Sequence, residues 1–185
     1  MLPYMRKINE IFYSLQGEGY HTGTPAVFVR FSGCNLKCSF CDTQHEEGTL
    51  MSDEEIVAEI RKYPAVTVIL TGGEPSLWID GVFIDRLHQA GKYVCVETNG
   101  TRPLPENIDW VTCSPKQGGK LGITRIDEVK VVYEGQDIEV YELLPAEHFF
   151  LQPCSCANTA ETVACVMQHP KWRLSLQTHK LIDIR

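Results

Sequence analysis

Seven short runs of apolar and β-branched residues recur along this chain of 185 residues, and they constrain the fold more than any other feature. Each run has the length and composition of a β-strand. Most are apolar almost throughout, which is typical of parallel strands covered on both faces. The runs are residues 26–31, 66–70, 93–98, 109–114, 128–133, 148–152 and 172–177. They predict a largely parallel sheet, to which segment 7–15 adds a strand at the edge.

Three segments have helical patterns and follow some of these strands. Ser52 opens a helix predicted over 52–63 with a capping-box pattern, and further helices are predicted over 80–92 and 158–169. Seven strands with only three helices cannot complete an eight-fold β/α barrel. We therefore predict an α/β fold, an incomplete and open parallel β/α barrel with few helices, as a single domain over residues 1–185.

Charge and cysteine usage limit the classes of function. A formal net charge of −7 argues against a stable complex with nucleic acid, which needs a basic face. The N-terminus has no signal-peptide pattern and no run approaches ~20 apolar residues, so we expect no membrane association and a cytoplasmic location. Eight cysteines in a reducing compartment indicate metal binding before disulfides.

Three of these cysteines, Cys34, Cys38 and Cys41, lie close together in the loop after the first long strand. Structural zinc and ordinary iron–sulfur clusters take four protein ligands, so the C-x3-C-x2-C spacing is one ligand short. Three thiolates can hold three corners of a [4Fe–4S] cube and leave the fourth iron open to a small molecule. Two alternatives remain, a closed Cys3His zinc site completed by His45 and three buried cysteines without a ligand.

Glycine-rich and polar loops follow the next strands, where parallel α/β folds place their sites. Gly72 and Gly73 allow the backbone to approach a ligand closely. Glu74 follows these glycines, and the two later loops carry the polar residues Asn99, Ser114 and Lys116. For each of these later loops taken alone, ordinary turn chemistry is an equally good explanation.

The cysteine spacing, with the aromatic Phe40 before the last cysteine, resembles the radical S-adenosylmethionine superfamily. In that superfamily the open iron is chelated by the amino and carboxylate groups of S-adenosylmethionine, and an electron from the cluster cleaves this cofactor to a 5′-deoxyadenosyl radical. The resemblance implies the superfamily's partial barrel and a glycine loop that holds the methionine part, with Glu74 on its ammonium. The implied cofactor-binding residues are Phe40, Gly72, Gly73, Glu74, Asn99, Ser114, Lys116 and Gln152.

Two longer stretches, 14–43 and 174–180, resemble the 7-carboxy-7-deazaguanine synthase family of radical S-adenosylmethionine enzymes. The resemblance implies a lyase of queuosine precursor (7-deazapurine) biosynthesis, a tRNA modification pathway. It would convert 6-carboxy-5,6,7,8-tetrahydropterin to 7-carboxy-7-deazaguanine and ammonia by radical ring contraction. The implied cofactors are the [4Fe–4S] cluster, S-adenosyl-L-methionine and Mg2+, and the implied electron donor is of the flavodoxin or ferredoxin type.

Four residues suit the substrate of this reaction. Arg30 offers a guanidinium fork to the carboxylate, and Glu18 can accept hydrogen bonds from the N–H edge of the pterin. A bulged turn would explain the glycines of the same loop, but not Glu18 or its neighbour Gln16. The match at the C-terminus adds His179, and Thr43 maps onto the family's Mg2+ position.

Other interpretations stay open at this point. The chain could be an activase that places a glycyl radical on a partner protein, or a non-enzymatic zinc- or cluster-binding interaction module. Cys113, Cys154 and Cys156 could hold a second cluster, although no four-thiolate spacing is present. The helices missing from the barrel would leave a flank open, and we expect a homodimer to cover it.

Overall fold

The computed structural model describes residues 4–39, 41 and 43–185. In this part of the chain a nine-stranded sheet has the order β3-β1-β2-β4-β5-β6-β7-β8-β9. Strands β2 and β4 to β9 are parallel, and β1 runs antiparallel to both of its neighbours. The strands are β1 (Met5–Leu15), β2 (Pro25–Phe31), β3 (Thr49–Ser52), β4 (Thr67–Gly72), β5 (Tyr93–Thr98), β6 (Trp110–Cys113), β7 (Glu128–Tyr133), β8 (His148–Pro153) and β9 (Arg173–Leu174).

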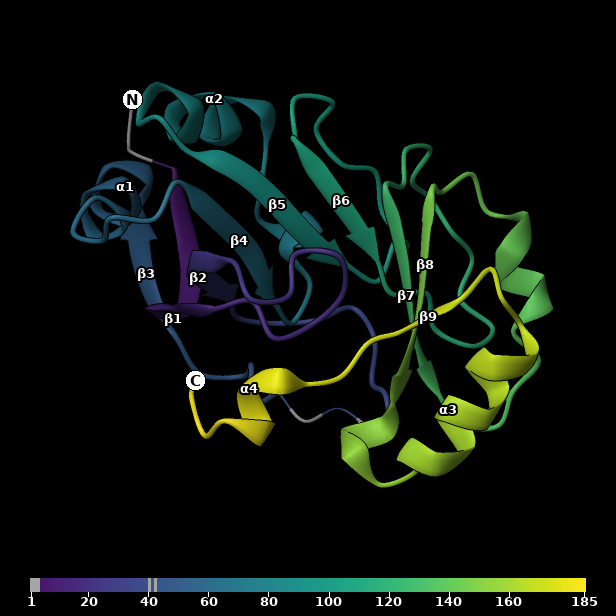
Figure 1. Ribbon diagram of the computed structural model, residues 1–185. Coiled ribbons are helices and arrows are strands. Elements are labelled where there is room, and N and C mark those ends of the chain that lie inside the picture. Colours follow the sequence, from purple (N-terminus) through teal and green to yellow (C-terminus); the bar gives the residue numbers. More distant parts are fainter. Residues whose placement is uncertain (1–3, 40, 42) are drawn as a thin grey trace.

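Figure 1 shows these strands fanning from β3 on one side to β9 on the other, an open arrangement in place of a closed barrel. A strand lies at each of the seven predicted runs, although β9 covers only two residues of the last. The prediction that segment 7–15 lies at the edge was wrong, because β3 pairs with the outer side of β1. Strand β3 has only four residues and no apolar run, so its sequence carried no signal.

The three predicted helices are present as α1 (Asp53–Ile60), α2 (Gly81–Gln89) and α3 (Thr159–Gln168). Ser52 and Glu55 form the expected capping box, and the Asp80 carboxylate accepts a hydrogen bond from the Phe83 N–H at 2.9 Å. A short helix, α4 (Thr178–Leu181), was not predicted. Three 3₁₀ turns complete the elements: η1 (Pro75–Leu77), η2 (Glu139–Leu143) and η3 (Cys154–Cys156).

The middle of the sheet has no helical crossovers. All of residues 93–133 are described, and no α-helix separates β5 from β6 or β6 from β7 in this range. This confirms the predicted incomplete barrel with few helices. None of the described helices has the length and apolar character that crossing a bilayer requires.

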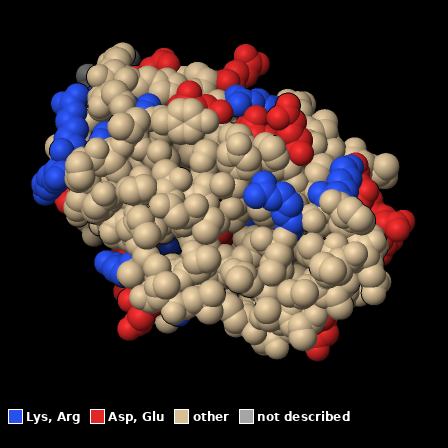
Figure 2. Space-filling view, in the orientation of Figure 1, with Lys and Arg blue, Asp and Glu red and all other residues tan. Residues whose placement is uncertain are grey.

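The two faces of the sheet have different chemistry. Valines of β2, β4 and β5, with Phe31 and Leu70, pack against α1 and α2 on the outer face. The inner face has apolar residues towards one end, where the Phe12 and Phe28 rings stack 4.9 Å apart beside Ile69 and Cys95. Because side chains alternate along a strand, the next inward positions, such as Arg30 and Glu97, carry polar groups into the interior. On the face seen in Figure 2, acidic and basic side chains are interspersed.

A buried arginine joins β1 to both early helices. The Arg6 side chain is fully buried, and its Nε lies 2.6 Å from Oδ1 of Asp53, the first residue of α1. Its Nη2 donates to Asp80, the N-cap of α2, at 3.1 Å, and its guanidinium lies over the Phe83 ring. Burial opposes ionisation of Asp80, but the Phe83 N–H and Arg6 together hold the pKa of this carboxyl below its ordinary value. The network fixes the helices against the sheet.

We predict that Arg6→Leu lowers the free energy of unfolding by about 3–5 kcal/mol, because it leaves a buried carboxylate without its partner. Urea denaturation followed by circular dichroism measures the change. The matched control is Lys62→Met, which removes a more exposed cation paired with Glu59 and should leave the free energy of unfolding close to the wild-type value. Equal effects of the two substitutions would contradict the structural role of Arg6.

Candidate active site

A cavity of about 1350 Å³ lies at the carboxyl ends of the parallel strands. Its lining includes the cysteine loop after β2, the glycine loop after β4 and inward side chains of β5, β7 and β8. Parallel α/β folds bind their ligands at this end of the strands, because the loop that follows each parallel strand begins there.

The cysteine loop and the glycine loop are fixed to each other by their backbones. The Glu74 N–H donates to the carbonyl of Gly33 at 2.9 Å, and the Gly73 N–H donates to the carbonyl of Phe31 at 3.1 Å. A Cβ atom on Gly73 would lie 1.9 Å from the Gly33 carbonyl oxygen, so no larger residue fits there. The glycine is therefore required for the close approach of the two loops.

Cys34, Cys38 and Cys41 have free thiols that line the cavity. The Leu36 N–H donates to the Cys34 sulfur at 3.4 Å. Burial, with the nearby Glu74 and the other two thiols, raises the pKa of Cys34 despite that hydrogen bond. A metal bound there would therefore displace a proton from this thiol.

The described residues form no closed site for a single metal ion. Among them, no three or more His, Cys, Asp or Glu side chains lie close enough together to hold one. The closed zinc site with His45 therefore has no support in the geometry. In a [4Fe–4S] cube each thiolate binds a different iron, so the sulfurs stand farther apart than around one ion.

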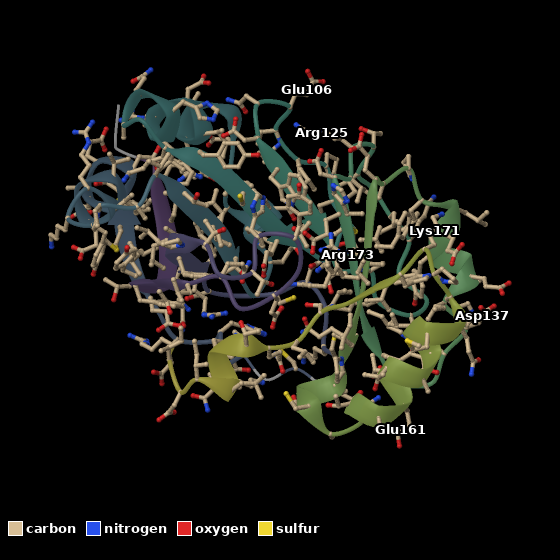
Figure 3. All side chains as sticks on the ribbon, in the orientation of Figure 1. Glu106, Arg125, Asp137, Glu161, Lys171 and Arg173 are labelled. Carbon is tan, nitrogen blue, oxygen red and sulfur yellow. The ribbon has the colours of Figure 1, made fainter. Side chains whose placement is uncertain are left out.

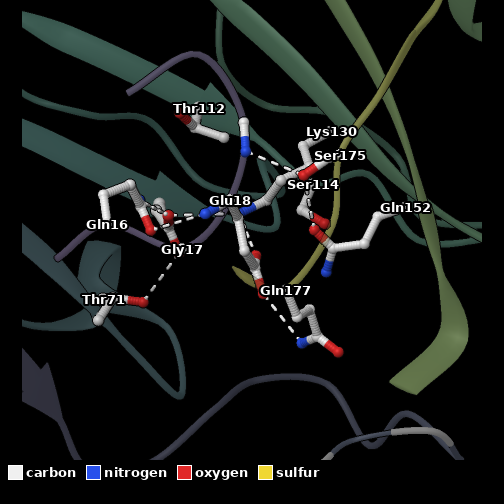
Figure 4. Close-up of polar contacts among 12 residues, drawn as sticks. Gln16, Gly17, Glu18, Thr71, Thr112, Ser114, Lys130, Gln152, Ser175 and Gln177 are labelled. Atoms are coloured by element: carbon white, nitrogen blue, oxygen red, sulfur yellow. Dashed lines mark hydrogen bonds and ion pairs between the residues drawn. The ribbon is translucent and has the colours of Figure 1, made fainter. Parts of the chain in front are cut away.

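A buried ion pair lies in the other half of the cavity. Lys130 Nζ lies 2.6 Å from Glu18 Oε2 and 3.3 Å from Glu97 Oε1. Gln177 donates to Glu18 Oε1 at 2.9 Å (Figure 4). Burial would raise the pKa of Glu18, but the Lys130 charge and hydrogen bonds, the Gln177 amide and the nearby His179 lower it to about 2. Glu18 is therefore ionised at neutral pH.

Segments from the two ends of the chain meet at this point. The Thr178 N–H donates to the carbonyl of Gly17 at 2.9 Å, and a Cβ atom on Gly17 would lie 2.1 Å from His179 Nδ1. The Ser175 hydroxyl accepts from the Gly19 N–H at 2.9 Å and donates to the Gln152 side chain at 3.0 Å. The loop after β1 is thus held by the C-terminal segment, and both present polar groups to the cavity.

Comparison with known proteins identifies the family. The profile of the Radical SAM superfamily matches residues 28–111. A 7-carboxy-7-deazaguanine synthase of Bacteroides thetaiotaomicron is 88% identical over 181 residues, which cover 98% of this chain and 100% of that protein. The chain belongs to the 7-carboxy-7-deazaguanine synthase family. A synthase of the same name from Nitratidesulfovibrio vulgaris is 42% identical over 96% of this chain and 98% of its own length. The crystal structure of QueE from Escherichia coli superposes with a TM-score of 0.78 at 30% identity, covering 93% of each chain.

Membership of the 7-carboxy-7-deazaguanine synthase family makes this chain a radical S-adenosylmethionine lyase. Its cofactors are a [4Fe–4S] cluster and S-adenosylmethionine. The three thiols and the glycine loop that faces them are consistent with both. The predicted superfamily fold is confirmed by the sheet topology and by the match to QueE.

The structure gathers most of the predicted site residues of this synthase-family chain around one cavity. Phe40 lies outside the described residues. The predicted residues that line the cavity are Gln16, Glu18, Arg30, Cys34, Cys38, Cys41, Thr43, Gly72, Gly73, Asn99, Ser114, Lys116, Gln152 and His179.

Two predicted residues have protein partners that the sequence did not indicate. The Glu74 carboxylate is fully buried and accepts from the Thr98 hydroxyl at 2.7 Å and the Asn99 N–H at 2.8 Å, so it joins two loops and does not line the cavity. The Arg30 Nε lies 2.8 Å from Glu10 Oε1. Contact of either side chain with a ligand stays a prediction.

The sequence reasoning missed Glu97, Lys130 and Gln177. Glu97 is the one charged residue in the run of β5, and Lys130 lies with the buried Glu128 in the otherwise largely apolar run of β7. That contrast was the available signal, because a charge within a buried strand needs a partner. Gln177 carried no comparable signal, since its role depends on where the C-terminal segment lies.

We predict that Gly73→Ala reduces the iron bound per chain after anaerobic reconstitution to less than about half of the wild-type amount, because the added methyl group displaces the cysteine loop. The contact is with backbone atoms of Gly33, which cannot move aside as a flexible side chain could. Iron analysis measures the change. The matched control is Gly81→Ala, whose Cβ would lie 3.7 Å from its nearest neighbour and should leave iron binding intact. Full iron binding in Gly73→Ala would contradict the requirement for this contact.

Proposed function

We propose that this chain converts 6-carboxy-5,6,7,8-tetrahydropterin to 7-carboxy-7-deazaguanine and ammonia. The observation that carries the proposal is that one cavity joins the three thiols to Gln16, Glu18, Arg30 and His179. When bound, the cluster and S-adenosylmethionine supply the one-electron chemistry that starts the ring contraction. An activase would need an open surface for a protein segment, whereas this cavity is bordered by both ends of the chain and suits a small polar substrate.

Glu18 and Gln16 are assigned to the pterin edge. The ionised Glu18 accepts hydrogen bonds from adjacent N–H groups, and carboxylate oxygens have lone pairs left after their protein contacts. The Gln16 side-chain oxygen accepts from the Glu18 N–H at 3.3 Å, and its amide donates to Glu97 at 2.8 Å. These bonds fix Gln16 against the Glu18 backbone and the Glu97 carboxylate and so define the orientation of the substrate ring.

The substrate carboxylate is assigned to Arg30 and His179, whose nitrogen donors line the same cavity. Thr43 lies on the cysteine loop and also lines the cavity. Mg2+ prefers oxygen ligands and keeps several waters, so a threonine hydroxyl and the substrate carboxylate suffice as its anchors. We assign Thr43 to this ion.

The S-adenosylmethionine side contains the loops after β4, β5 and β6. Gly72 and Gly73 offer backbone to the methionine part, and Asn99 extends from the end of β5. Lys116 Nζ donates to the Ser114 hydroxyl at 2.9 Å. Burial lowers the pKa of Lys116, which the nearby Cys38 thiol opposes. We assign these residues, with Gln152, to the cofactor.

A decisive test reconstitutes the protein anaerobically and supplies reductant, S-adenosylmethionine, Mg2+ and the carboxypterin. We expect 7-carboxy-7-deazaguanine and ammonium in equal amounts, measured by liquid chromatography and mass spectrometry. Glu18→Gln should lower kcat/KM by about 10–100-fold, because it replaces an acceptor oxygen with a donor and leaves a buried group unpaired. The matched control Glu106→Gln changes an exposed carboxylate at the rim of the molecule in Figure 3 and should have wild-type activity. Absence of product from protein with an intact cluster would overturn the proposal.

We also propose a single domain over residues 1–185, a cytoplasmic location, an electron donor of the flavodoxin or ferredoxin type, and a homodimer. The dimer is supported by the middle of the sheet, where β5, β6 and β7 are joined without helices. A second copy would cover the flank that these missing helices leave. Sedimentation velocity should give the mass of a dimer, and a monomer at micromolar concentration would contradict this part of the proposal.

A further inference from the structure

Lys130 is a buried residue that lines the cavity, and its ammonium lies among acidic groups. Its side chain is 6% exposed. Burial alone would lower the pKa of this lysine, but Glu18, Glu97 and Glu128 raise it. Lys130 is therefore charged at neutral pH. A buried charge costs free energy unless it is paired, so the cation belongs with the carboxylates as one unit.

The carboxylates around Lys130 keep unused hydrogen-bond acceptor sites at the cavity. Each carboxylate has about four lone-pair sites. Glu18 accepts one hydrogen bond from Lys130 and one from Gln177. Glu97 accepts hydrogen bonds from Lys130, Gln16 and Thr71. The remaining lone pairs of Glu18 can take only hydrogen-bond donors for as long as this group is ionised.

We propose that Lys130 is a positioning residue that makes the cavity select heterocycles with adjacent N–H donors. Its ammonium holds Glu18 ionised, so that a 2-amino-4-oxo ring is bound and a ring with a carbonyl in place of the amino group is rejected. The inference rests on the proposed function, because it concerns the same substrate edge. It adds Lys130 to the residues that determine which heterocycle is bound, and it gives the physical cause of that selectivity.

Removing the lysine charge should change which hydrogen-bond pattern the cavity accepts. Without Lys130, burial dominates the ionisation of Glu18, and buried glutamates are documented with pKa values up to about 8–9. A protonated Glu18 donates a hydrogen bond as well as accepting one. It can therefore donate to the carbonyl of the 2,4-dioxo analogue, and it loses one acceptor site for the 2-amino ring.

The test compares two ligands on the reconstituted holoenzyme, the carboxypterin and its 2,4-dioxo analogue, at pH 6 and pH 8. Calorimetry or competition gives both dissociation constants. The wild-type protein should prefer the 2-amino ring by more than about 100-fold at both pH values, because the dioxo analogue brings an acceptor against an ionised acceptor. In Lys130→Met the preference should fall below about tenfold, and the carboxypterin should bind at least about fivefold more weakly at pH 6 than at pH 8.

The sign of this pH effect follows from the ionisation of Glu18. In the wild-type protein the pKa of Glu18 is lowered to about 2, so the acceptor state is complete throughout the range tested. In the variant a raised pKa removes the acceptor state as the pH falls. His179 is present in both proteins, so the comparison between them isolates the effect of removing Lys130. The other charged or titratable groups around the pair are Glu97, Lys116, Glu128 and His179.

A control variant tests whether the change in selectivity is specific to Lys130. Lys171→Met removes an exposed lysine at the rim of the molecule in Figure 3 and should keep the wild-type preference and pH profile. If Lys130→Met does not fold, Lys130→Gln carries the same test, because its amide keeps N–H donors without the charge. An unchanged preference and a flat pH profile in a folded Lys130 variant would overturn the inference.

Failure of the two proposals gives different results. If the wild-type protein binds the 2-amino ring selectively but forms no deazaguanine product, the proposed reaction is contradicted and the role of Lys130 is not. A wild-type protein that forms product, with Lys130 variants of unaltered selectivity, would remove only the role of Lys130.

Discussion

A parallel sheet brings the carboxyl ends of its strands to one edge, and the whole active site depends on this constraint. The register of β2, β4 and β5 places the cysteine loop, the glycine loop and the loop after Thr98 side by side. Backbone hydrogen bonds from the glycine loop to Phe31 and Gly33 then join the cysteine loop to the next strand of the sheet. These contacts fix the cysteines relative to the rest of the cavity.

The interior of the open barrel has a polar half that the fold must stabilise. Phe12, Phe28 and Ile69 fill one end with apolar groups, and beyond them Lys130 lies between Glu18 and Glu97. A cation among carboxylates satisfies its own hydrogen bonds and neutralises part of their charge. The same arrangement prepares a surface of acceptors for a substrate with N–H donors, so stability of the interior and recognition use the same atoms.

Several parts of the fold and site could be predicted because their cause is local. The capping box at Ser52, the apolar strands and the three-cysteine loop each depend on residues that are near one another in the sequence. The missing helices of the middle sheet were equally visible, because residues 99–127 contain no helical pattern. Strand β3 could not be predicted, since four residues without an apolar run form a strand only because β1 offers an unpaired edge.

The sequence by itself determined the partial barrel, the three thiols with their vacant fourth position and, through two long stretches of similarity, the family. Only the tertiary structure decided that Glu74 joins two loops and does not line the cavity, and that Lys130 and Gln177 hold Glu18. The physical reason is distance along the chain. Glu18 is separated from Lys130 by 112 residues and from Gln177 by 159, and contacts between such distant positions exist only once the sheet has set the register of every strand.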